Sequence, residues 1–394
     1  MALPQDLVEA ILLRFPPSEP ASLVRAALVC KPWCRLISGR RFRRRFCEFH
    51  RSPPRLGFLL NIVDRFDYVA TRFVPATSFR PPRADHTLCV ARDARHGRVV
   101  LEAKKTKQDE EARIVVWDPT TDERWELPTA PLGPSYNFCW TATVVCAATV
   151  SGTCDHLDCR GEPFIVVAVG NNENNDGNGV ASLWVYSSEA DAWGKPTPLS
   201  KGSVVASPTA LVGKTLYFTI GGADMSVLMY DLATQKTSIA RLPLPHRHYF
   251  NTLPMTMEDG GLGVAGLEGF GRLYLWSVEA NVNPNGDIRM ECTQNRVIEL
   301  DKLLPVDPCS IFSGFLSYLH GVDVFFVGTI EGFFTFDPKS GRVRKVYQEA
   351  FDDLVGGTGI YGAIPYMNFY TPVLGAADST GDAPSMGASS ASKA

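Results

Sequence analysis

The sequence lacks several features that mark whole classes of protein. No run of apolar residues approaches the roughly 20 that a membrane-spanning helix needs. Asp6 and Glu9 interrupt any apolar segment at the start, so no signal peptide is expected. No Asn-x-Ser/Thr glycosylation acceptor occurs in the 394 residues. We therefore expect a protein of the cytoplasm or nucleus that has no membrane partner.

The signatures of catalysis are also missing. The sequence contains no P-loop, nucleophile elbow, HExxH motif or EF-hand loop. Two stretches, at 261–266 and 357–362, match the pattern Gly-x-Gly-x-x-Gly of dinucleotide-binding proteins. Neither is followed by residues that can open a helix, so we interpret both as turn glycines. The sequence predicts a non-catalytic protein without a cofactor.

Cysteines are present without regular spacing. The ten positions are Cys30, Cys34, Cys47, Cys89, Cys139, Cys146, Cys154, Cys159, Cys292 and Cys309. In a reducing compartment such cysteines are expected to be small buried hydrophobic residues. Cys154, His156 and Cys159 suggest a metal site, but a second ligand pair at a familiar distance is missing. The sequence therefore predicts no metal.

What is present begins with a helical pattern in the first 50 residues. Leu7 and Ile11 lie four residues apart and predict one apolar face of a helix, which the Pro-Pro pair that follows brings to an end. A second helix is predicted over residues 20–29, and a third from residue 31 or 32 to residue 38. Three short apolar helices present more hydrophobic side chains than one small core can bury. We expect a partner to cover the excess, although a helical hairpin that caps a larger domain is the alternative.

The order and spacing of three short motifs, Leu3-Pro4, Ile11-Leu12 and Val29-Cys30-Lys31 with Trp33 close behind, are distinctive. These residues resemble an F-box, the helical module that docks substrate receptors onto the Skp-family linker of a cullin-RING ubiquitin ligase. The resemblance covers about residues 3–46, and Pro32 departs from it because it would start the third helix abruptly.

The resemblance implies ten candidates for binding the linker. They are Leu3, Pro4, Leu7, Ile11, Leu12, Leu23, Val29, Cys30, Trp33 and Leu36. Some of these side chains must instead form the core of the module itself, and the sequence does not sort the two groups.

Positive charge is concentrated near the start of the chain. Residues 1–55 hold 11 Lys/Arg and 4 Asp/Glu, whereas the whole chain carries a net charge of −3. Most of the excess lies in arginines between residues 40 and 55. We interpret this stretch as a solvated helix face, with Phe42, Phe46 and Phe49 packed inward. A nuclear-import signal or a nucleic-acid patch is the alternative.

A Pro-rich joint at 51–56 separates the helices from a long series of β-type runs. A glycine turn before an apolar strand recurs, as does a strand that ends in an aromatic residue and a polar turn. Asp118 and Asp337, each followed by Pro, have the chemistry of a type I turn. Units of this kind recur every 45 to 70 residues, which is typical of a β-propeller. About six units fit between residues 57 and 374, and 355–374 can supply the strand that closes the ring.

The predicted fold class is therefore multidomain, a three-helix F-box at 1–50 followed by an all-β, propeller-like domain at 57–374. The β series resembles Kelch-type blades and the F-box-associated β domain of many plant F-box proteins, with Tyr186 and Trp193 as the best aromatic pair. An irregular β-sandwich or two smaller β domains are the alternatives. Residues 375–394, rich in Ser, Ala and Gly, are predicted to be a disordered tail.

The resemblance implies the substrate-recognition subunit of an SCF-type (Skp-cullin-F-box) E3 ubiquitin ligase. The F-box would dock on the Skp-family linker and, through it, on a cullin, while loops of the β domain bind an unknown target protein. Such an adaptor performs no chemistry, because catalysis depends on the proximity that assembly supplies. The alternatives are a nucleic-acid-binding protein that uses the arginines, and a β-propeller hydrolase or lectin with a helical cap.

Overall fold

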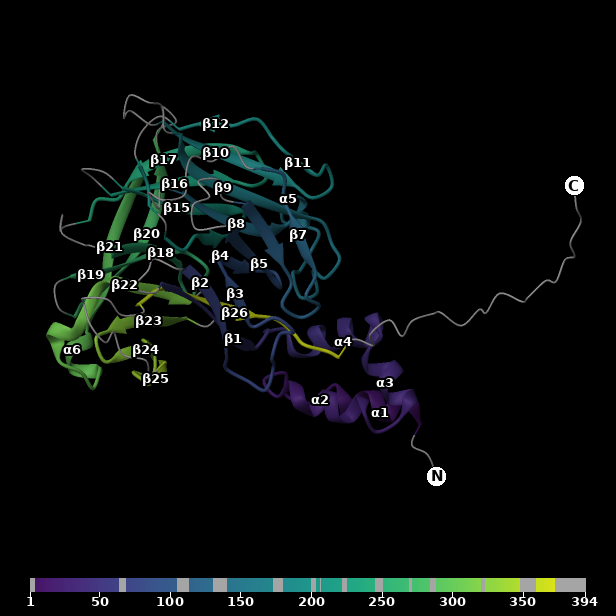
Figure 1. Ribbon diagram of the computed structural model, residues 1–394. Helices are drawn as coiled ribbons and strands as arrows, with labels where there is room; N and C mark the ends of the chain where they lie inside the picture. The colour runs from purple at the N-terminus through teal and green to yellow at the C-terminus, as the bar shows by residue number, and fades with distance from the viewer. Residues whose placement is uncertain are drawn as a thin grey trace, which may run out of the picture.

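The computed structural model describes residues 4–63, 69–104, 113–129, 140–172, 180–199, 203–205, 207–221, 225–244, 251–268, 271–283, 288–319, 323–347 and 359–372. The chain opens with four helices that lie together at one end of a large β domain (Figure 1). They are α1 (Gln5–Leu12), α2 (Pro20–Ala27), α3 (Lys31–Ile37) and α4 (Arg40–His50). The three predicted helices are confirmed to within two residues at each end. The fourth was not counted in the three-helix prediction.

Six antiparallel sheets follow, and we call them blades one to six. Blade one contains β26 (Gly359–Met367), β1 (Arg55–Val63), β2 (Val69–Pro75) and β3 (Asp85–Thr87). Blade two contains β4 (Cys89–Arg95), β5 (Arg98–Ala103), β6 (Arg113–Trp117) and β7 (Arg124–Glu126). Blade three contains β8 (Trp140–Cys146), β9 (Phe164–Asn172), β10 (Val180–Ser187), β11 (Ala192–Trp193) and β12 (Thr197–Pro198).

The other three blades have the same meander. Blade four contains β13 (Ser203–Val204), β14 (Ala210–Val212), β15 (Thr215–Gly221), β16 (Ser226–Asp231) and β17 (Lys236–Arg241). Blade five contains β18 (Asn251–Thr256), β19 (Leu262–Glu268), β20 (Arg272–Val282) and β21 (Ile288–Glu299). Blade six contains β22 (Ile311–Leu319), β23 (Val324–Thr329), β24 (Gly332–Phe336) and β25 (Val343–Tyr347). Three short helical turns, α5 (Ala148–Ser151), α6 (Leu300–Leu303) and η2 (Pro308–Ser310), complete the described elements.

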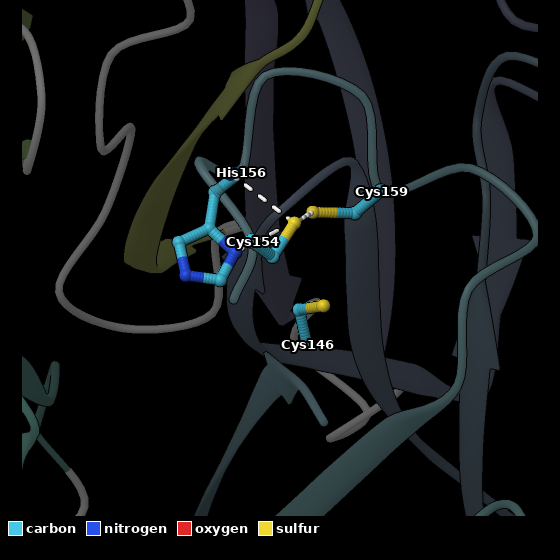
Figure 2. A group of neighbouring side chains, drawn as sticks. All are labelled: Cys146, Cys154, His156 and Cys159. Atoms are coloured by element: carbon cyan, nitrogen blue, oxygen red, sulfur yellow. Dashed lines mark hydrogen bonds between the residues drawn. The ribbon is translucent and has the colours of Figure 1, made fainter. Parts of the chain in front are cut away.

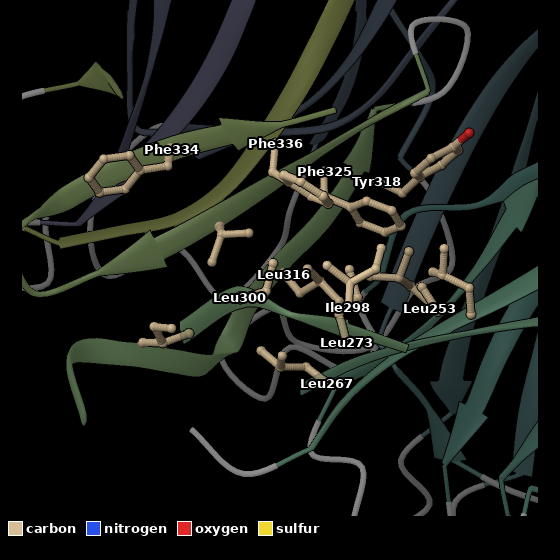
Figure 3. Packing of buried hydrophobic residues seen from close by; sticks show 14 of the residues in the cluster. Leu253, Leu267, Leu273, Ile298, Leu300, Leu316, Tyr318, Phe325, Phe334 and Phe336 are labelled. Carbon is tan, nitrogen blue, oxygen red and sulfur yellow. The ribbon is translucent and has the colours of Figure 1, made fainter. Parts of the chain in front are cut away.

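The blades form a closed ring, because a buried apolar cluster joins each blade to the next. The cluster between blades five and six combines Leu267 and Leu273 with Phe325 and Phe336 (Figure 3). Five similar clusters join the remaining neighbours, including blade six to blade one. Each sheet is therefore buried on both faces, which a single blade cannot achieve. The structure has the six-bladed, propeller-like architecture that the repeat predicted.

Ring closure depends on the last described strand. β26 pairs with β1, for example Leu59 with Ile364, so blade one is built from both ends of the β domain. Within it, Tyr366 is buried and its hydroxyl donates to the Gly97 carbonyl at 3.1 Å. The prediction that 355–374 contains the closing strand is confirmed. The predicted tail, 375–394, lies outside the described residues.

A common turn links the last two strands of blades two, four and six. An aspartate at its first position accepts a hydrogen bond, at 2.6 to 2.8 Å, from a backbone N–H two or three residues further on. These residues are Asp118, Asp231 and Asp337. The fifth residue of each turn has a positive φ of 56° to 66°. The turns predicted at Asp118 and Asp337 are thus present, since aspartate favours turns, and each is closed by a hydrogen bond from the N–H of its fifth residue to the aspartate carbonyl.

The interpretation of the two Gly-x-Gly-x-x-Gly stretches as turns is wrong. Gly263 and Gly266 lie within β19, and Gly359 and Gly362 lie within β26. A Cβ atom at Gly263 would come within 2.4 Å of the Met257 sulfur, so close packing requires glycine there. Within the described residues, no helix is both long enough and apolar enough to span a membrane.

Candidate functional site

The four N-terminal helices share one small core. α1 begins after Pro4. The backbone of Pro4 is extended rather than helical, so this residue marks the N-terminal boundary of the helix. Its inner face places Val8 and Leu12 against Leu23 of α2, Ile37 of α3 and the phenylalanines of α4. Because residues three and four apart share a helix face, the neighbouring face of α1 carries Leu7 and Ile11 away from this core.

The structure sorts the ten predicted linker-binding residues into three groups. Leu12 and Leu23 are buried and belong to the core. Trp33 and Leu36 are half-buried and pack against the core from its edge. Pro4, Leu7, Ile11, Val29 and Cys30 are exposed. Leu3 lies outside the described residues.

The exposed group is unusually rich in large apolar side chains. The exposed fractions of Leu7, Ile11 and Val29 are 54%, 48% and 65%. Leu28, which the sequence reasoning did not select, is 80% exposed. Its position directly before Val29, at the end of α2, was the available signal.

A groove of about 990 Å³ lies between α1, α3 and the start of α4. Val29, Cys30, Trp33 and Leu36 line it, so four of the predicted residues meet at one concave surface. The Arg45–Glu9 ion pair, 2.7 Å between Nη1 and Oε1, ties α4 to α1 beside it. The groove presents apolar side chains that a partner can cover.

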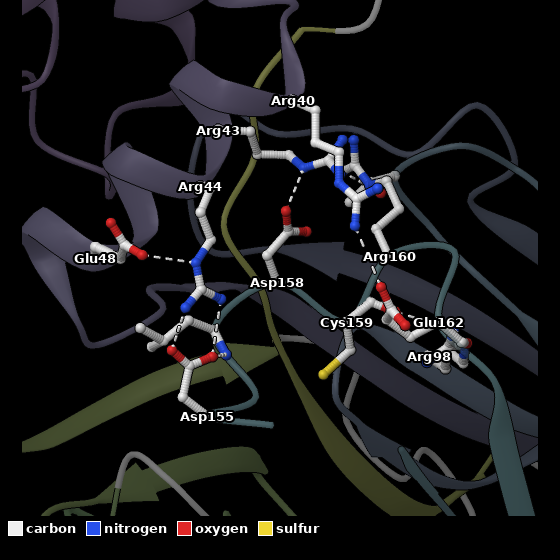
Figure 4. Close-up of polar contacts among 12 residues, drawn as sticks. Arg40, Arg43, Arg44, Glu48, Arg98, Asp155, Asp158, Cys159, Arg160 and Glu162 are labelled. Carbon is white, nitrogen blue, oxygen red and sulfur yellow. Dashed lines mark hydrogen bonds and ion pairs between the residues drawn. The ribbon is translucent and has the colours of Figure 1, made fainter. Parts of the chain in front are cut away.

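The opposite side of the helical unit docks on the ring through α4. Arg43 Nε lies 2.8 Å from Asp158 Oδ2, and both side chains are largely buried. Arg44 contacts both carboxylate oxygens of Asp155, at 3.0 and 2.5 Å (Figure 4). Arg40 lies 3.3 Å from Glu162. All three acidic residues belong to the loop between β8 and β9, residues 147–163, which we call the β8–β9 loop.

These contacts correct the interpretation of residues 40–55. The arginines lie on a helix, but Arg43 is not solvated, because its side chain is only 14% exposed and is paired with Asp158. The hydrogen bond from Arg44 lowers the pKa of Asp155. Phe42 and Phe46 pack inward as predicted, whereas Phe49 is 55% exposed.

Apolar contacts reinforce the same interface. Phe369, which follows β26, is buried in the core of the helices, and its ring meets that of Phe46 edge-on at 6.0 Å. Leu157 of the β8–β9 loop packs against the same core. Beside them lies a cavity of about 430 Å³ that reaches Cys47, His96 and His156. The helices and the ring are thus joined by both ion pairs and a shared apolar contact.

Three cysteines and one histidine lie close together at the end of β8 and in the β8–β9 loop, the loop that α4 contacts (Figure 2). Cys146 ends β8, and Cys154, His156 and Cys159 follow in the β8–β9 loop. The three sulfur atoms and a ring nitrogen of His156 all lie within 4.8 Å of one another. The sequence reasoning noticed the last three residues but missed Cys146, because the strand end lies eight positions before Cys154.

Two further contacts orient this group. His96 stacks on His156, with ring centroids 4.2 Å apart, and its Nδ1 accepts the backbone N–H of Cys146 at 2.9 Å. Burial lowers the pKa of His96 to about 3, so its ring is a neutral acceptor. On the other side, His156 Nε2 lies 3.3 Å from Thr149 Oγ1.

Charged side chains on the inner strands of the ring are paired with one another. Arg95 Nε lies 2.9 Å from Asp93 Oδ2, which also accepts from the Thr143 hydroxyl. The same guanidinium contacts the Thr209 carbonyl, so these bonds connect blades two, three and four. Arg92 pairs with Glu102 and covers the ring of Trp140 at 4.7 Å. Such pairs account for these charges as parts of the ring's structure.

Comparison with known proteins separates the two parts of the chain. Residues 1–48 match the protein-family model described as F-box-like. No curated protein matches the chain. Among solved structures, a fungal alcohol oxidase of the AA5 family in complex with copper is similar at 12% identity and a TM-score of 0.40, over 76% of this chain and 66% of that one. The chain spans just under two-thirds of that enzyme, and a likeness of this size carries no argument about chemistry. The chain thus joins an F-box-like domain to a six-bladed, β-propeller-like ring.

Proposed function

We propose that this protein is the substrate-recognition subunit of an SCF-type E3 ubiquitin ligase. The observation that carries the proposal is the exposed apolar surface that Leu7, Ile11, Leu28 and Val29 contribute to the F-box-like helices, together with the groove that Val29 and Trp33 line. A Skp-family linker that covers this surface would remove it from water, which favours binding by about 25 cal/mol per Å² before the costs of association. Through the linker, the chain would reach a cullin.

The ring would hold the target protein. Its six blades form a rigid frame, and the loops between strands are the parts that can vary without disturbing the core. We propose the class of plant-type F-box proteins with a Kelch-like β domain, which the contact between Tyr186 and Trp193 across β10 and β11 supports, at 5.5 Å between ring centroids. In this assignment the chain is an adaptor without catalytic activity.

Domain organisation and location are parts of the same proposal. α4 ends at His50 and β1 begins at Arg55, which supports a joint between a helical module and the ring but limits it to 51–54 of the predicted 51–56. None of the nine cysteines in the described part of the chain forms a disulfide, which supports a reducing compartment such as the cytoplasm or nucleus.

The arginines give the nucleic-acid alternative little support. Arg40, Arg43 and Arg44 pair with acidic residues of the β8–β9 loop, and Arg45 pairs with Glu9. Phosphate binding would have to compete with these ion pairs.

The proposal is tested by calorimetry of the full chain against a purified Skp-family linker. We expect Leu7→Ala with Ile11→Ala to weaken linker binding roughly 10-fold to 1000-fold, which corresponds to the loss of about 1.4–4 kcal/mol at an interface. The thermal melt should change little, because both side chains are exposed. Ile330→Ala, which truncates an equally large exposed side chain on the ring, is the matched control and should bind the linker normally.

Trp33→Ala gives a second measurement, because this side chain lines the groove and also packs on the core. It should lower both linker affinity and the melting temperature. Unchanged linker affinity in the double variant and in Trp33→Ala would contradict the proposal.

A further inference from the structure

The cluster of three cysteines and one histidine has the donor set of a metal centre. We propose that Cys146, Cys154, His156 and Cys159 bind one Zn²⁺ ion, a site independent of whatever the F-box-like domain binds. Cys146 is fixed by its place at the end of β8, and α5 then turns the chain back. Gly152, with φ of 73°, caps α5 in the left-handed conformation and lets the other three ligands return to Cys146.

The distances within the cluster agree with tetrahedral zinc. A Zn–S bond of about 2.3 Å and a Zn–N bond of about 2.0–2.1 Å imply S···S edges of about 3.8 Å and S···N edges of about 3.5 Å. Cys154 Sγ lies 3.8 Å from Cys159 Sγ, and Cys159 Sγ lies 3.6 Å from His156 Nδ1. The four atoms all lie within 4.8 Å of one another, so small side-chain rotations would complete the tetrahedron.

The chemistry of the donors selects zinc over the common hard cations. Three thiolates and an imidazole suit Zn²⁺, whereas Mg²⁺ and Ca²⁺ require oxygen ligands. The carboxylates closest in sequence, Asp155 and Asp158, are engaged by Arg44 and Arg43 and do not compete. With four protein ligands the site has no open position, which is the arrangement of structural rather than catalytic zinc.

Neighbouring polar groups form an outer layer around the four ligands. Thr149 Oγ1 can accept a hydrogen bond from His156 Nε2, which leaves Nδ1 free to bind the metal. The backbone N–H of His156 points to Cys154 Sγ at 3.3 Å. Zn²⁺ with three thiolates carries a net negative charge, and the buried Arg98 guanidinium lies close by, 3.1 Å from the Cys159 carbonyl. The fit therefore extends beyond the four ligands.

The site would order the loop on which α4 docks. Asp155 stands between two ligands, Cys154 and His156, and Asp158 directly precedes the ligand Cys159. A metal that fixes these ligands therefore fixes the acidic partners of Arg44 and Arg43. We infer that zinc sets the orientation of the F-box-like helices relative to the ring.

The first test measures metal in the full-length protein, purified under reducing conditions without a metal-affinity step. We expect one zinc per chain by elemental mass spectrometry. Replacement by Co²⁺ should produce a thiolate-to-cobalt charge-transfer band and the intense visible bands of tetrahedral cobalt. Cys146→Ser should lower zinc affinity by more than the roughly 10–100-fold that the loss of an outer-layer partner costs. Cys309→Ser, at an exposed cysteine outside the cluster, is the matched control and should keep its zinc.

The wild-type measurements decide the proposal even if Cys146→Ser fails to fold. Anaerobic, reduced protein that takes up much less than one zinc per chain, or that gives no thiolate–cobalt band, would overturn it. So would a soluble Cys146→Ser variant that keeps full affinity, or a Cys154–Cys159 disulfide in the reduced protein.

The orienting role has its own readout. Removal of zinc from the full chain should speed amide hydrogen exchange in α4 and in the β8–β9 loop, while blade five, which supplies none of the four ligands, serves as the internal reference. Unchanged hydrogen exchange in α4 after zinc removal would contradict the inference that zinc orients the helices.

Discussion

The helical module and the ring differ in how many of their large apolar side chains are exposed. Nine large hydrophobic side chains are exposed in the described part of the chain, and five of them belong to the helices. These five are Leu7, Ile11, Leu28, Val29 and Phe49. The ring is several times longer, yet its described residues expose only four, which are scattered over three blades and the helical turn α6. The ring buries most of its own apolar surface, whereas the helices leave part of theirs exposed.

The difference follows from geometry. A closed ring gives every sheet a neighbour on each face, so all six blades are covered. Four short helices enclose one small core. Phe369 and Leu157, which belong to the ring part of the chain, also pack into or against this core. A unit of this size buries too small a fraction of its surface to be robust alone.

The ring is broken most severely by removal of its closing strand. A chain that ends at residue 350 lacks β26 and leaves the inner edge of β1 unpaired. We expect the cooperative melting transition of the β domain to disappear, because blade one loses its inner strand and the contacts that Tyr366 and Ala363 make with blades two and six. A chain that ends at residue 372 is the length control and should melt normally. Differential scanning calorimetry distinguishes the two, and a normal transition in the shorter chain would contradict ring closure by β26.

The helical module is tested by two phenylalanines of α4. Phe46 is fully buried, so Phe46→Ala should cost about 3–5 kcal/mol of stability in the module. Phe49 is 55% exposed on the same helix, and Phe49→Ala should change the stability by less than about 0.5 kcal/mol. The stability of both variants is measured by chemical denaturation, with hydrogen exchange of the amides in the helices as the signal. Equal effects of the two variants would mean that the module's core is wrongly placed.

The ring should respond to acid through His86. Burial lowers the pKa of this histidine to about 4, and its ring lies 4.2 Å from that of Trp117. The unfolded chain takes up the proton near pH 6.5, whereas the folded ring does so only near pH 4. The stability is therefore complete above pH 6.5 and falls between pH 6.5 and 4, by roughly 2–3 kcal/mol.

Denaturant titrations across this pH range measure the effect. His86→Leu does not titrate and should show a correspondingly flatter dependence. The same slope in both proteins would assign the acid sensitivity to other groups.

The smallest expected effect concerns the interface between the two regions. Arg43→Ala breaks a largely buried ion pair and should loosen the helices from the ring by about 1–2 kcal/mol. Arg44→Ala removes more contacts, but its pairs are exposed, so we expect about 0–1 kcal/mol. Limited proteolysis at the joint, residues 51–54, reports the loosening. A larger effect for Arg44→Ala than for Arg43→Ala would contradict the expectation that the buried ion pair contributes more to the interface than the exposed ones.

The elements and the architecture were predictable because their signals are local. Proline positions and the i, i+4 spacing located three helices, and the recurrent Asp turns located the blades. The exposure of Leu7 and the burial of Leu12 were not predictable, because both are leucines of one helix and only tertiary contacts distinguish them. The two glycine patterns were misread as turns because sequence alone does not reveal which glycines are required by close packing within a strand.

The interface and the cysteine cluster were hidden for a related reason. The partners of Arg43 and Arg44 lie more than one hundred residues away, so no local pattern connects them. Cys146 belongs to a strand and Cys154 to a loop. Their separation of eight residues matches no familiar spacing of zinc ligands, so the sequence does not connect them. Three cysteines and a histidine within fourteen residues were the signal that the sequence did offer.

Blade one has a consequence for biosynthesis. Its inner strand, β26, leaves the ribosome last, after all the other strands of the ring have been made. The helices emerge first, but their core also includes Leu157 of the β8–β9 loop and Phe369, which follows β26 in the chain. Until translation reaches residue 367, the apolar faces that border blade one remain uncovered, a state prone to aggregation. The core of the helices and the ring are therefore completed at nearly the same point of synthesis, by Phe369 and by the strand β26 that directly precedes it.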